Sequence, residues 1–294
     1  MGRVIVLGNA GLDISLSVQR LPDLGETLLG HDVRRAPGGK GLNQAVTAAR
    51  AGAEVLFRAP LGRDAQGSEI ASVIAAEACL MFHPHHFAHP TDFSLLMVLP
   101  DGENSIVSAG PCAAAFRIEA AGAFAAKAES GDVFVMQGNL RADSTQQAME
   151  IASRRGATTV FNPAPLWWDA KSLLPFCDIV VTNRGEAASI TGMSDPTEGS
   201  SALCTLGAKV SIITLGADGC VVHQEGKTRH FAADPVEAVD TTGCGDTFCG
   251  VLAALLAQGQ TLDDAIIRAQ TAAAITATRR GAFAALPSRS ELLA

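Results

Sequence analysis

The stretch 238-AVDTTGCGDTFCGVLAALLAQ-258 places Gly243, Gly245 and Asp246 at the start of a long apolar run that has the character of a buried helix. A tight turn followed by a helix cap explains this pattern, because glycine adopts strained turns and aspartate is a favoured N-cap residue. An anion site beside a catalytic base explains it equally well, because the first turn of a helix presents free N–H groups. This segment alone leaves both interpretations open.

A second glycine-rich segment, 36-APGGKGLNQAVTAARAGA-53, also leads directly into an alanine-rich helix. It is not a Walker A motif, because Gly41 follows Lys40 where Ser or Thr is required, and Arg34 stands in place of the first glycine. No G-x-G-x-x-G follows the first apolar run, which disfavours a nicotinamide dehydrogenase.

Composition excludes several classes of protein. Hydrophobic residues make up 48% of the 294 residues and charged residues 18%, which is typical of a compact soluble enzyme. The net charge of −8 argues against a nucleic-acid partner. The 7 cysteines form no C-x-x-C pair, which indicates a reducing compartment. With no signal peptide or membrane-spanning run in the sequence, we expect a cytoplasmic protein without a membrane partner.

Short apolar runs alternate with helical patterns along the whole chain. Six runs show little polar alternation, as strands covered on both faces do: 3–8, 55–60, 132–138, 158–164, 178–183 and 210–216. This alternation predicts a single α/β domain over 1–294, with a three-layer, doubly wound, mostly parallel sheet between helices. Ligands then bind at the carboxyl ends of the strands.

Two regions break this rhythm with alternating apolar and polar residues, at about 12–36 and 92–109. The second contains 100-PDGEN-104, which is typical of a hairpin turn. We predict that both regions form one small β-sheet that covers the site as a lid. The alternative that each is a separate peripheral hairpin remains open.

The two glycine-rich segments resemble the paired signatures of the ribokinase-like (PfkB) carbohydrate kinase family, and most closely those of its ribokinases. The segments 161-FNPAP-165, 182-TNRGEA-187 and 213-ITLGADG-219 fall in the family's order, so the resemblance covers essentially the whole chain. It implies the ribokinase-like fold and ATP-dependent phosphorylation of a primary hydroxyl of a small sugar, with a furanose such as ribose as the first candidate. The alternatives are a nucleoside kinase of the same family and a sugar-binding sensor without catalysis.

The resemblance also assigns catalytic roles, and it favours the anion-site interpretation of the opening stretch. Asp246 matches the general base that takes the proton from the acceptor hydroxyl. Gly243, Cys244 and Gly245 match the backbone anion hole for the transferring phosphoryl group. Cys244 replaces the family's usual alanine.

On the acceptor side, Asp13, Gly39, Lys40 and Asn43 match the residues that bind the sugar hydroxyls in the family. Asn139 falls where ribokinases usually carry a glutamate that touches the sugar. This departure affects the identity of the substrate rather than the reaction.

On the nucleotide side, Asn183 matches a residue that approaches the phosphates, and Glu186 matches the carboxylate that orders the water shell of Mg²⁺. A first-turn acid favoured by the helix dipole is the alternative for Glu186. Thr214 and Gly216 match phosphate and ribose contacts, and Gln270 matches a residue beside adenine.

The resemblance further implies a monovalent-cation site, with K⁺ the expected ion, at Asp240, Thr242 and Gly281. Ala285 replaces a serine that usually contributes there. Members of the family often dimerise through the lid, so we expect a homodimer.

Two other features receive structural interpretations. His83, His85, His86 and His89 lie close together, but no cysteine accompanies them and Pro84 interrupts their spacing, so we predict a polar strand rather than a metal site. Trp167 and Trp168 follow 162-NPAP-165 and are interpreted as packing residues.

Overall fold

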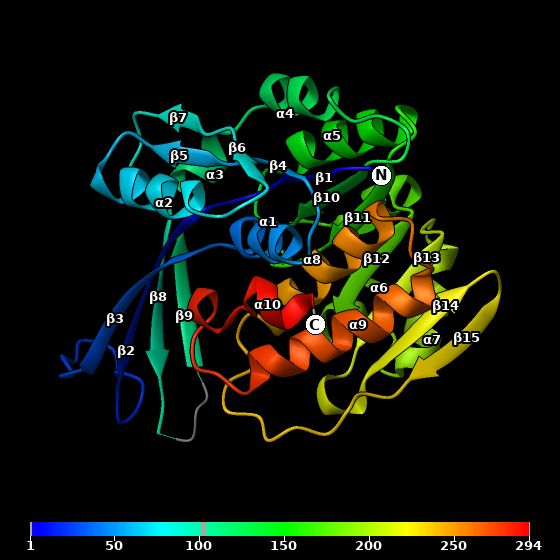
Figure 1. The fold of residues 1–294 in the computed structure, drawn as a ribbon. Helices are drawn as coiled ribbons and strands as arrows, with labels where there is room; N and C mark the ends of the chain where they lie inside the picture. Colours follow the sequence, from blue (N-terminus) through cyan, green and yellow to red (C-terminus); the bar gives the residue numbers. More distant parts are fainter. Residues whose placement is uncertain (1, 101–103, 294) are drawn as a thin grey trace.

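The computed structural model of the protein describes residues 2–100 and 104–293, which build a large sheet between two layers of helices (Figure 1). The sheet has nine strands in the order β15-β14-β13-β12-β11-β10-β1-β4-β6. Its strands are β1 Val4–Leu7, β4 Val55–Arg58, β6 Leu80–Phe82, β10 Val133–Gln137, β11 Thr158–Asn162, β12 Ile179–Asn183, β13 Val210–Thr214, β14 Cys220–Gln224 and β15 Lys227–Phe231. All neighbours pair in parallel except β13–β14 and β14–β15.

Successive residues of each central strand enter two different cores, because side chains alternate across a sheet. In β10, Val133 and Val135 pack on the side of α1 and α8, whereas Phe134 and Met136 pack on the side of α4 and α5. The first layer contains α1 Lys40–Arg50, α2 Ala65–Ala75, α8 Cys244–Ala257 and α9 Leu262–Ala277. The second contains α4 Ile118–Ala125, α5 Ala142–Arg154, α6 Arg184–Thr191 and α7 Pro196–Thr205. The predicted three-layer α/β architecture is confirmed.

A separate four-stranded sheet projects from this body (Figure 1). Its order is β3-β2-β8-β9, with bounds β2 Gly11–Ser17, β3 His31–Gly38, β8 Phe93–Val98 and β9 Asn104–Ala109. The two segments that interrupt the strand–helix alternation therefore form one sheet. The parallel pairing of β2 with β8 connects them. Residues 101–103 of the expected hairpin turn lie outside the described residues. That this sheet closes over a site stays a prediction.

Shorter elements complete the described chain. They are β5 Pro60–Gly62, β7 His85–Phe87, α3 Pro111–Ala115, η1 Ala170–Phe176, η2 Gly216–Asp218, η3 Phe283–Ala285 and α10 Arg289–Leu292. His85 and His86 lie in β7, and no cluster of metal-binding side chains occurs within residues 2–100 and 104–293. Of the helices in the described residues, none has the length and apolarity needed to cross a membrane.

Close contact between α1 and α8 depends on Gly250. A Cβ atom at this position would lie 2.6 Å from the carbonyl oxygen of Gln44 and 2.8 Å from Cβ of Thr47. Both atoms belong to α1 and neither is the end of a flexible side chain. Only glycine therefore lets α8 approach α1 this closely.

We predict that Gly250→Ala destabilises the protein relative to Gly122→Ala by about 1–3 kcal/mol, the usual cost of overpacking. Gly122 is the matched control, because its added Cβ would meet only side-chain atoms, Cδ1 of Ile151 at 3.1 Å and Cγ of Gln147 at 3.5 Å, and no backbone. Both changes gain the same helix propensity, about 1 kcal/mol. Urea denaturation of the two variants measures the difference, and equal midpoints would contradict the proposed close packing.

Candidate active site

Polar side chains end several neighbouring strands at one edge of the large sheet. Gln137 ends β10 and is paired in register with Asn162, which ends β11. Asn183 ends β12 and is paired with Thr214, which ends β13. Because these strands are parallel, their carboxyl ends lie side by side, where ligands bind in such sheets.

Asp246 lies in the first turn of α8 and is 95% removed from solvent, with a relative exposure of 5%. The N-cap of this helix is Gly243, in the left-handed region at φ 86°, and no side chain caps the helix. The interpretation of Asp246 as a helix cap is therefore wrong. Its carboxylate instead turns toward α1.

Three residues of α1 face this carboxylate. Asn43 Nδ2 donates to Asp246 Oδ2 at 3.1 Å, and Gln44 Nε2 donates to Asp246 Oδ1 at 3.1 Å. The ammonium of Lys40 lies 3.8 Å from Asp246 Oδ1, and the negative charge of Asp246 raises the pKa of Lys40. The spacing i, i+3, i+4 brings all three onto one face of the helix.

Glycine lets α1 begin against the turn that follows β1. Gly39 precedes the helix at φ 106°, and a Cβ on Gly41 would lie 2.7 Å from the backbone nitrogen of Asn9. Asn9 Oδ1 in turn accepts the N–H of Gly41 at 3.3 Å. These two glycines therefore serve close backbone packing, which fixes where Lys40 and Asn43 lie.

A buried chain of amides, not anticipated from the sequence, supports Asp246 from behind. Gln137 Nε2 donates to Gln44 Oε1 at 2.7 Å, and Gln44 Nε2 also lies 3.3 Å from Asn162 Oδ1. Asn162 Nδ2 donates to the carbonyl of Val181 at 2.9 Å. One signal in the sequence could have indicated Gln44: it stands four residues after Lys40 and therefore lies on the same face of the predicted helix. The amides connect Asp246 to the three neighbouring strands β10, β11 and β12.

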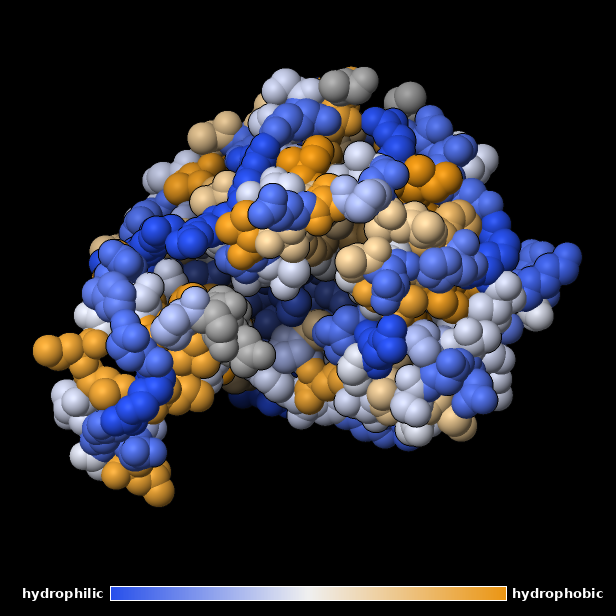
Figure 2. Space-filling view, turned by 90° about the horizontal axis from the view of Figure 1, so that it is seen from below, coloured by the Kyte–Doolittle hydropathy of each residue, from blue (hydrophilic) through white to orange (hydrophobic). Residues whose placement is uncertain are grey.

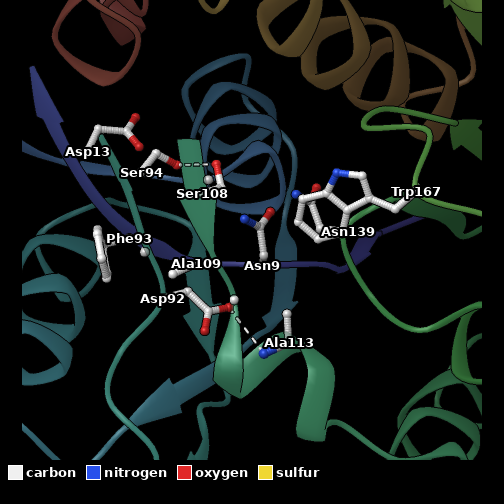
Figure 3. A pocket seen from close by; sticks show the side chains of 13 residues that line it. Asn9, Asp13, Asp92, Phe93, Ser94, Ser108, Ala109, Ala113, Asn139 and Trp167 are labelled. Atoms are coloured by element: carbon white, nitrogen blue, oxygen red, sulfur yellow. Dashed lines mark hydrogen bonds between the residues drawn. The ribbon is translucent and has the colours of Figure 1, made fainter. Parts of the chain in front are cut away.

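A polar pocket opens between the small sheet and the strand edge (Figure 3). Asp13 and Ser94 of the small sheet lie on one side, and Asn139 and Trp167 on the other. The lining residues include Asn9, Gly11, Asp13, Gly39, Asp92, Phe93, Ser94, Ser108, Asn139 and Trp167. Of the predicted acceptor residues, Asp13, Gly39 and Asn139 line this pocket, and Lys40 and Asn43 lie on the adjoining turn of α1.

Two carboxylates in this pocket have raised pKa values. Burial raises the pKa of Asp13 to about 6, the charge of Asp246 adds to the effect, and the Ser94 hydroxyl opposes it. Burial also raises the pKa of Asp92 to about 6, although Asp92 accepts the N–H groups of Cys112 and Ala113. Asp92 therefore holds the start of α3, whereas Asp13 faces Asp246.

The two tryptophans differ in environment. Trp168 stacks on Phe161 with 6.1 Å between ring centroids and donates its Nε1–H to the carbonyl of Leu140 at 3.0 Å. Trp167 is 57% exposed and lines the polar pocket. The interpretation as packing residues is right for Trp168 and wrong for Trp167.

A second cavity of about 180 Å³ lies at the α8 N-terminus. Its lining is mostly apolar and includes Thr214, Gly216, Ala238, Cys244, Gly245, Phe248, Gln270 and Ala273. Three predicted nucleotide residues, Thr214, Gly216 and Gln270, therefore gather around one cavity. Burial raises the pKa of Cys244 to about 11, so its thiol stays protonated at neutral pH.

Asn183 and Glu186 form a reciprocal capping box at the start of α6. Asn183 Oδ1 accepts the N–H of Glu186 at 2.8 Å, and Glu186 Oε2 accepts the N–H of Asn183 at 2.9 Å. Burial raises the pKa of Glu186, and the N–H of Asn183 and the charge of Lys40 oppose that effect. Both residues thus have a structural role, and neither belongs to the lining of the apolar cavity.

Asp240 fastens the loop before α8 to the loop after α9. It accepts the N–H of Thr242 at 2.9 Å and that of Gly281 at 2.8 Å. Burial works against ionisation of Asp240, but these hydrogen bonds outweigh it and lower its pKa. The three predicted cation-site residues therefore lie together, and Ala285 is fully buried in η3.

Comparison with known proteins agrees with this geometry. The family described as pfkB family carbohydrate kinases matches residues 1–289. This chain belongs to that family. It is therefore a phosphotransferase that acts on an alcohol group of a carbohydrate.

Several similar proteins are named ribokinases. The ribokinase of Haemophilus influenzae is 35% identical, with 98% of this chain and 96% of the relative covered, and that of Mus musculus is 32% identical, with 98% and 93% covered. The crystal structure of Thermotoga maritima ribokinase has a TM-score of 0.91 at 26% identity, covering 100% of this chain and 98% of that one. Arabidopsis thaliana ribokinase, solved with ribose and ATP, has a TM-score of 0.88 at 27% identity, covering the same shares.

We predict that Gln44 and Gln137 are energetically coupled in this kinase. Gln44→Leu or Gln137→Leu alone leaves a buried amide without its partner, which costs about 1–3 kcal/mol. The double variant removes both ends of the 2.7 Å hydrogen bond and should be more stable than the sum of the single losses implies. A double-mutant cycle from denaturant unfolding should give 0.5–3 kcal/mol in that direction, as contacting residues do. If the losses in unfolding free energy of the two single variants summed to that of the double variant, the proposed hydrogen bond between the two amides would be contradicted.

Proposed function

We propose that the protein transfers the γ-phosphoryl group of ATP to a primary hydroxyl of a small furanose, with ribose as the first candidate. The observation that carries this proposal is the buried carboxylate of Asp246 in the first turn of α8. It follows Gly245, which lines the apolar cavity, and faces Lys40, which follows Gly39 of the polar pocket. The names of the relatives support ribose and ATP as the two substrates.

The acceptor binds in the polar pocket in this proposal. Asp13, when ionised, accepts hydrogen bonds from two sugar hydroxyls, and Lys40, Asn43 and the backbone of Gly39 hold others. Asn139 contacts the far side of the sugar. The primary hydroxyl then points to Asp246, which takes its proton as the bond to phosphorus forms.

The phosphoryl group meets backbone donors at the start of α8. The N–H groups of Gly245 and Asp246 donate to no residue within the described parts of the chain, whereas Cys244 N–H donates to the carbonyl of Thr241 at 3.2 Å. The anion hole therefore rests on Gly245 and Asp246 after Gly243 has turned the chain, with Cys244 joining only if Thr241 moves. The positive end of the helix dipole adds to the stabilisation.

The nucleotide base occupies the apolar cavity of about 180 Å³. Gln270 lies at its wall, donates its amide N–H to the carbonyl of Ala232 and retains a buried Oε1 that accepts no hydrogen bond from a described residue. This oxygen suits an exocyclic amino group of adenine, and Thr214 and Gly216 lie where the sugar and phosphates of ATP continue.

Residues of this chain also suit the metal ions of the reaction. Mg²⁺ keeps several waters and seldom takes a full protein cage, and only Oε2 of Glu186 is used in the capping box, so Oε1 can order a metal-bound water. Bound Mg²⁺ neutralises charge on the phosphates. Asp240, with the loops of Thr242 and Gly281, is the proposed K⁺ site, where the ion would bind carbonyl and carboxylate oxygens.

The small sheet, formed by about 12–36 and 92–109, is the proposed lid and dimer interface. Apolar side chains lie on this sheet beside a hollow in the molecular surface (Figure 2). Val33, Ile106 and Val107 are 66%, 50% and 61% exposed. Ile106 and Val107 are consecutive in β9 and point to opposite faces of the sheet. A second copy of the chain would cover the face of Val107, whereas closure over the acceptor would cover the face of Ile106 and exclude water from phosphoryl transfer.

A nucleoside is the second candidate for the acceptor, in which case the protein would be a nucleoside kinase of the same family. Membership of a carbohydrate kinase family argues against the other alternative, a sugar-binding sensor without catalysis. The deciding experiment is a coupled assay of ATP turnover with a panel of pentoses, hexoses and nucleosides. The proposal expects ribose or another free furanose to give the highest kcat/KM. A nucleoside with the highest value, or no sugar-dependent turnover, would contradict it.

We expect Asp246→Asn to fold and bind the acceptor but to lose kcat by roughly 10²–10⁴-fold, the usual contribution of general-base catalysis. The control is Asp263→Asn, which removes an exposed carboxylate that pairs with Arg229 far from the pocket and should leave kcat unchanged. Steady-state kinetics, with circular dichroism as a check on folding, distinguishes the two. A kcat for Asp246→Asn near that of the wild type would remove Asp246 from the mechanism.

Gly245→Ala tests the anion hole. An added Cβ at this position meets no protein atom within 4 Å, so the fold has no need of glycine there. We expect normal stability but a kcat lowered on the order of 10²-fold, because crowding that displaces the phosphoryl group by about 1 Å has this effect. Gly122→Ala, on the opposite layer of helices, is the control. Unchanged kcat in Gly245→Ala would place the phosphoryl group elsewhere.

A further inference from the structure

The loop that carries Trp167 is fastened to the end of β10. Gly138 N–H donates to the carbonyl of Ala164 at 3.0 Å, and a Cβ on Gly138 would lie 2.2 Å from the carbonyl oxygen of Pro165. Glycine at 138 therefore lets the loop after β11 lie directly against the residue that precedes Asn139.

Trp168 anchors the other end of this loop. Its ring stacks on Phe161 at the end of β11, and its Nε1–H donates to the carbonyl of Leu140, the residue after Asn139. The loop is thus held on both sides of Asn139. Trp167, left between these anchors, lies on the pocket side with Asn139, opposite Asp13 and Ser94 (Figure 3).

Asn139 adds a polar atom without a partner. Its Oδ1 is buried and accepts no hydrogen bond from residues 2–100 or 104–293. An unpaired buried acceptor costs about 1–3 kcal/mol unless a ligand or water donates to it. One wall of the pocket therefore presents an exposed indole beside an amide oxygen that requires a donor.

We propose that Trp167 and Asn139 form a specificity subsite for the acceptor of the proposed kinase reaction, on which this inference rests. The indole of Trp167 packs against the C–H face of a free furanose, and Asn139 Oδ1 accepts a hydrogen bond from one of its hydroxyls. A ring that is apolar on its face and hydroxylated at its edge matches both groups at once.

The rest of the pocket favours a free sugar over a nucleoside as the occupant. Asn9, Asp13, Ser94 and Ser108 offer amide, carboxylate and hydroxyl groups, which match a polyhydroxyl ligand. Apart from Trp167, Phe93 is the large apolar side chain among the lining residues. Because polar groups make up most of the named lining, the pocket suits the hydroxyls of a free sugar better than the apolar faces of a nucleobase.

The chain contains 2 tryptophans, so the two single Trp→Phe variants can separate the emission of Trp167 from that of Trp168. Ribose added to the wild type, without ATP, should change the tryptophan emission in a saturable way. Trp168→Phe should keep this change, because Trp168 lies outside the pocket, and Trp167→Phe should lose it. A response that survives in Trp167→Phe would overturn the proposal.

Kinetics provides the second readout. Trp167→Ala should raise the ribose KM, and the Kd from calorimetry, by about 2- to 12-fold, as expected for loss of one aromatic contact, with kcat little changed. Trp167→Phe retains an aromatic face and should recover most of the affinity. Wild-type ribose KM in Trp167→Ala would overturn the subsite while leaving the proposed reaction intact.

The same variants distinguish the two kinds of acceptor. If Trp167→Ala impaired a nucleoside more than ribose, the indole would be stacking on a base, and the assignment to a free sugar would be wrong. If the wild type phosphorylated no sugar, the proposed function itself would fail, whatever the fluorescence of Trp167 reported.

Discussion

The structure depends on how a single buried carboxylate is held. Asp246 lies beneath the α8 N-terminus, where it accepts hydrogen bonds from Asn43 and Gln44 and faces the ammonium of Lys40. Removing a carboxylate from water is costly unless such partners compensate. Here the partners come from one helix, α1, whose position is fixed by glycine contacts with α8 and with the turn after β1. The close packing of α1 against α8 therefore also positions the groups that compensate the buried charge of Asp246.

That arrangement separates two environments on either side of Asp246. The polar pocket is bounded by the small sheet and contains Asp13, whose raised pKa reflects its burial near Asp246. The other cavity is mostly apolar and is bounded by α8 and α9. In the proposed reaction, the carboxylates of Asp13 and Asp92 would repel an anionic donor from the polar pocket, whereas the N-terminus of α8 would attract its phosphates. On this proposal, the charge distribution would orient the two substrates.

Much of this organisation could be predicted from the sequence, and the remainder could not for physical reasons. Apolar runs predicted strands of the large sheet, and the ordered motifs indicated the family. The three residues predicted to bind the nucleotide, Thr214, Gly216 and Gln270, line one cavity, and their role stays a prediction. Gln44 and Gln137 escaped notice because their roles depend on which strand ends become neighbours, which local pattern does not encode. Trp167 and Trp168 are neighbouring residues of the same type, so the sequence alone does not distinguish their environments. Only the loop contacts at Gly138 and Leu140 decide that one packs and the other faces the pocket.

The most direct test of the central claim, that Asp246 is the point at which both substrates meet, is a crystal structure of the protein with ribose and a non-hydrolysable ATP analogue. The account predicts one primary hydroxyl oxygen within about 2.6–3.2 Å of an Asp246 carboxylate oxygen, which is hydrogen-bond reach for a general base. The same oxygen should lie in line with the γ-phosphorus, and the γ-phosphate should contact the N–H of Gly245. A sugar whose primary hydroxyl points away from Asp246, with the γ-phosphate remote from the α8 N-terminus, would contradict it.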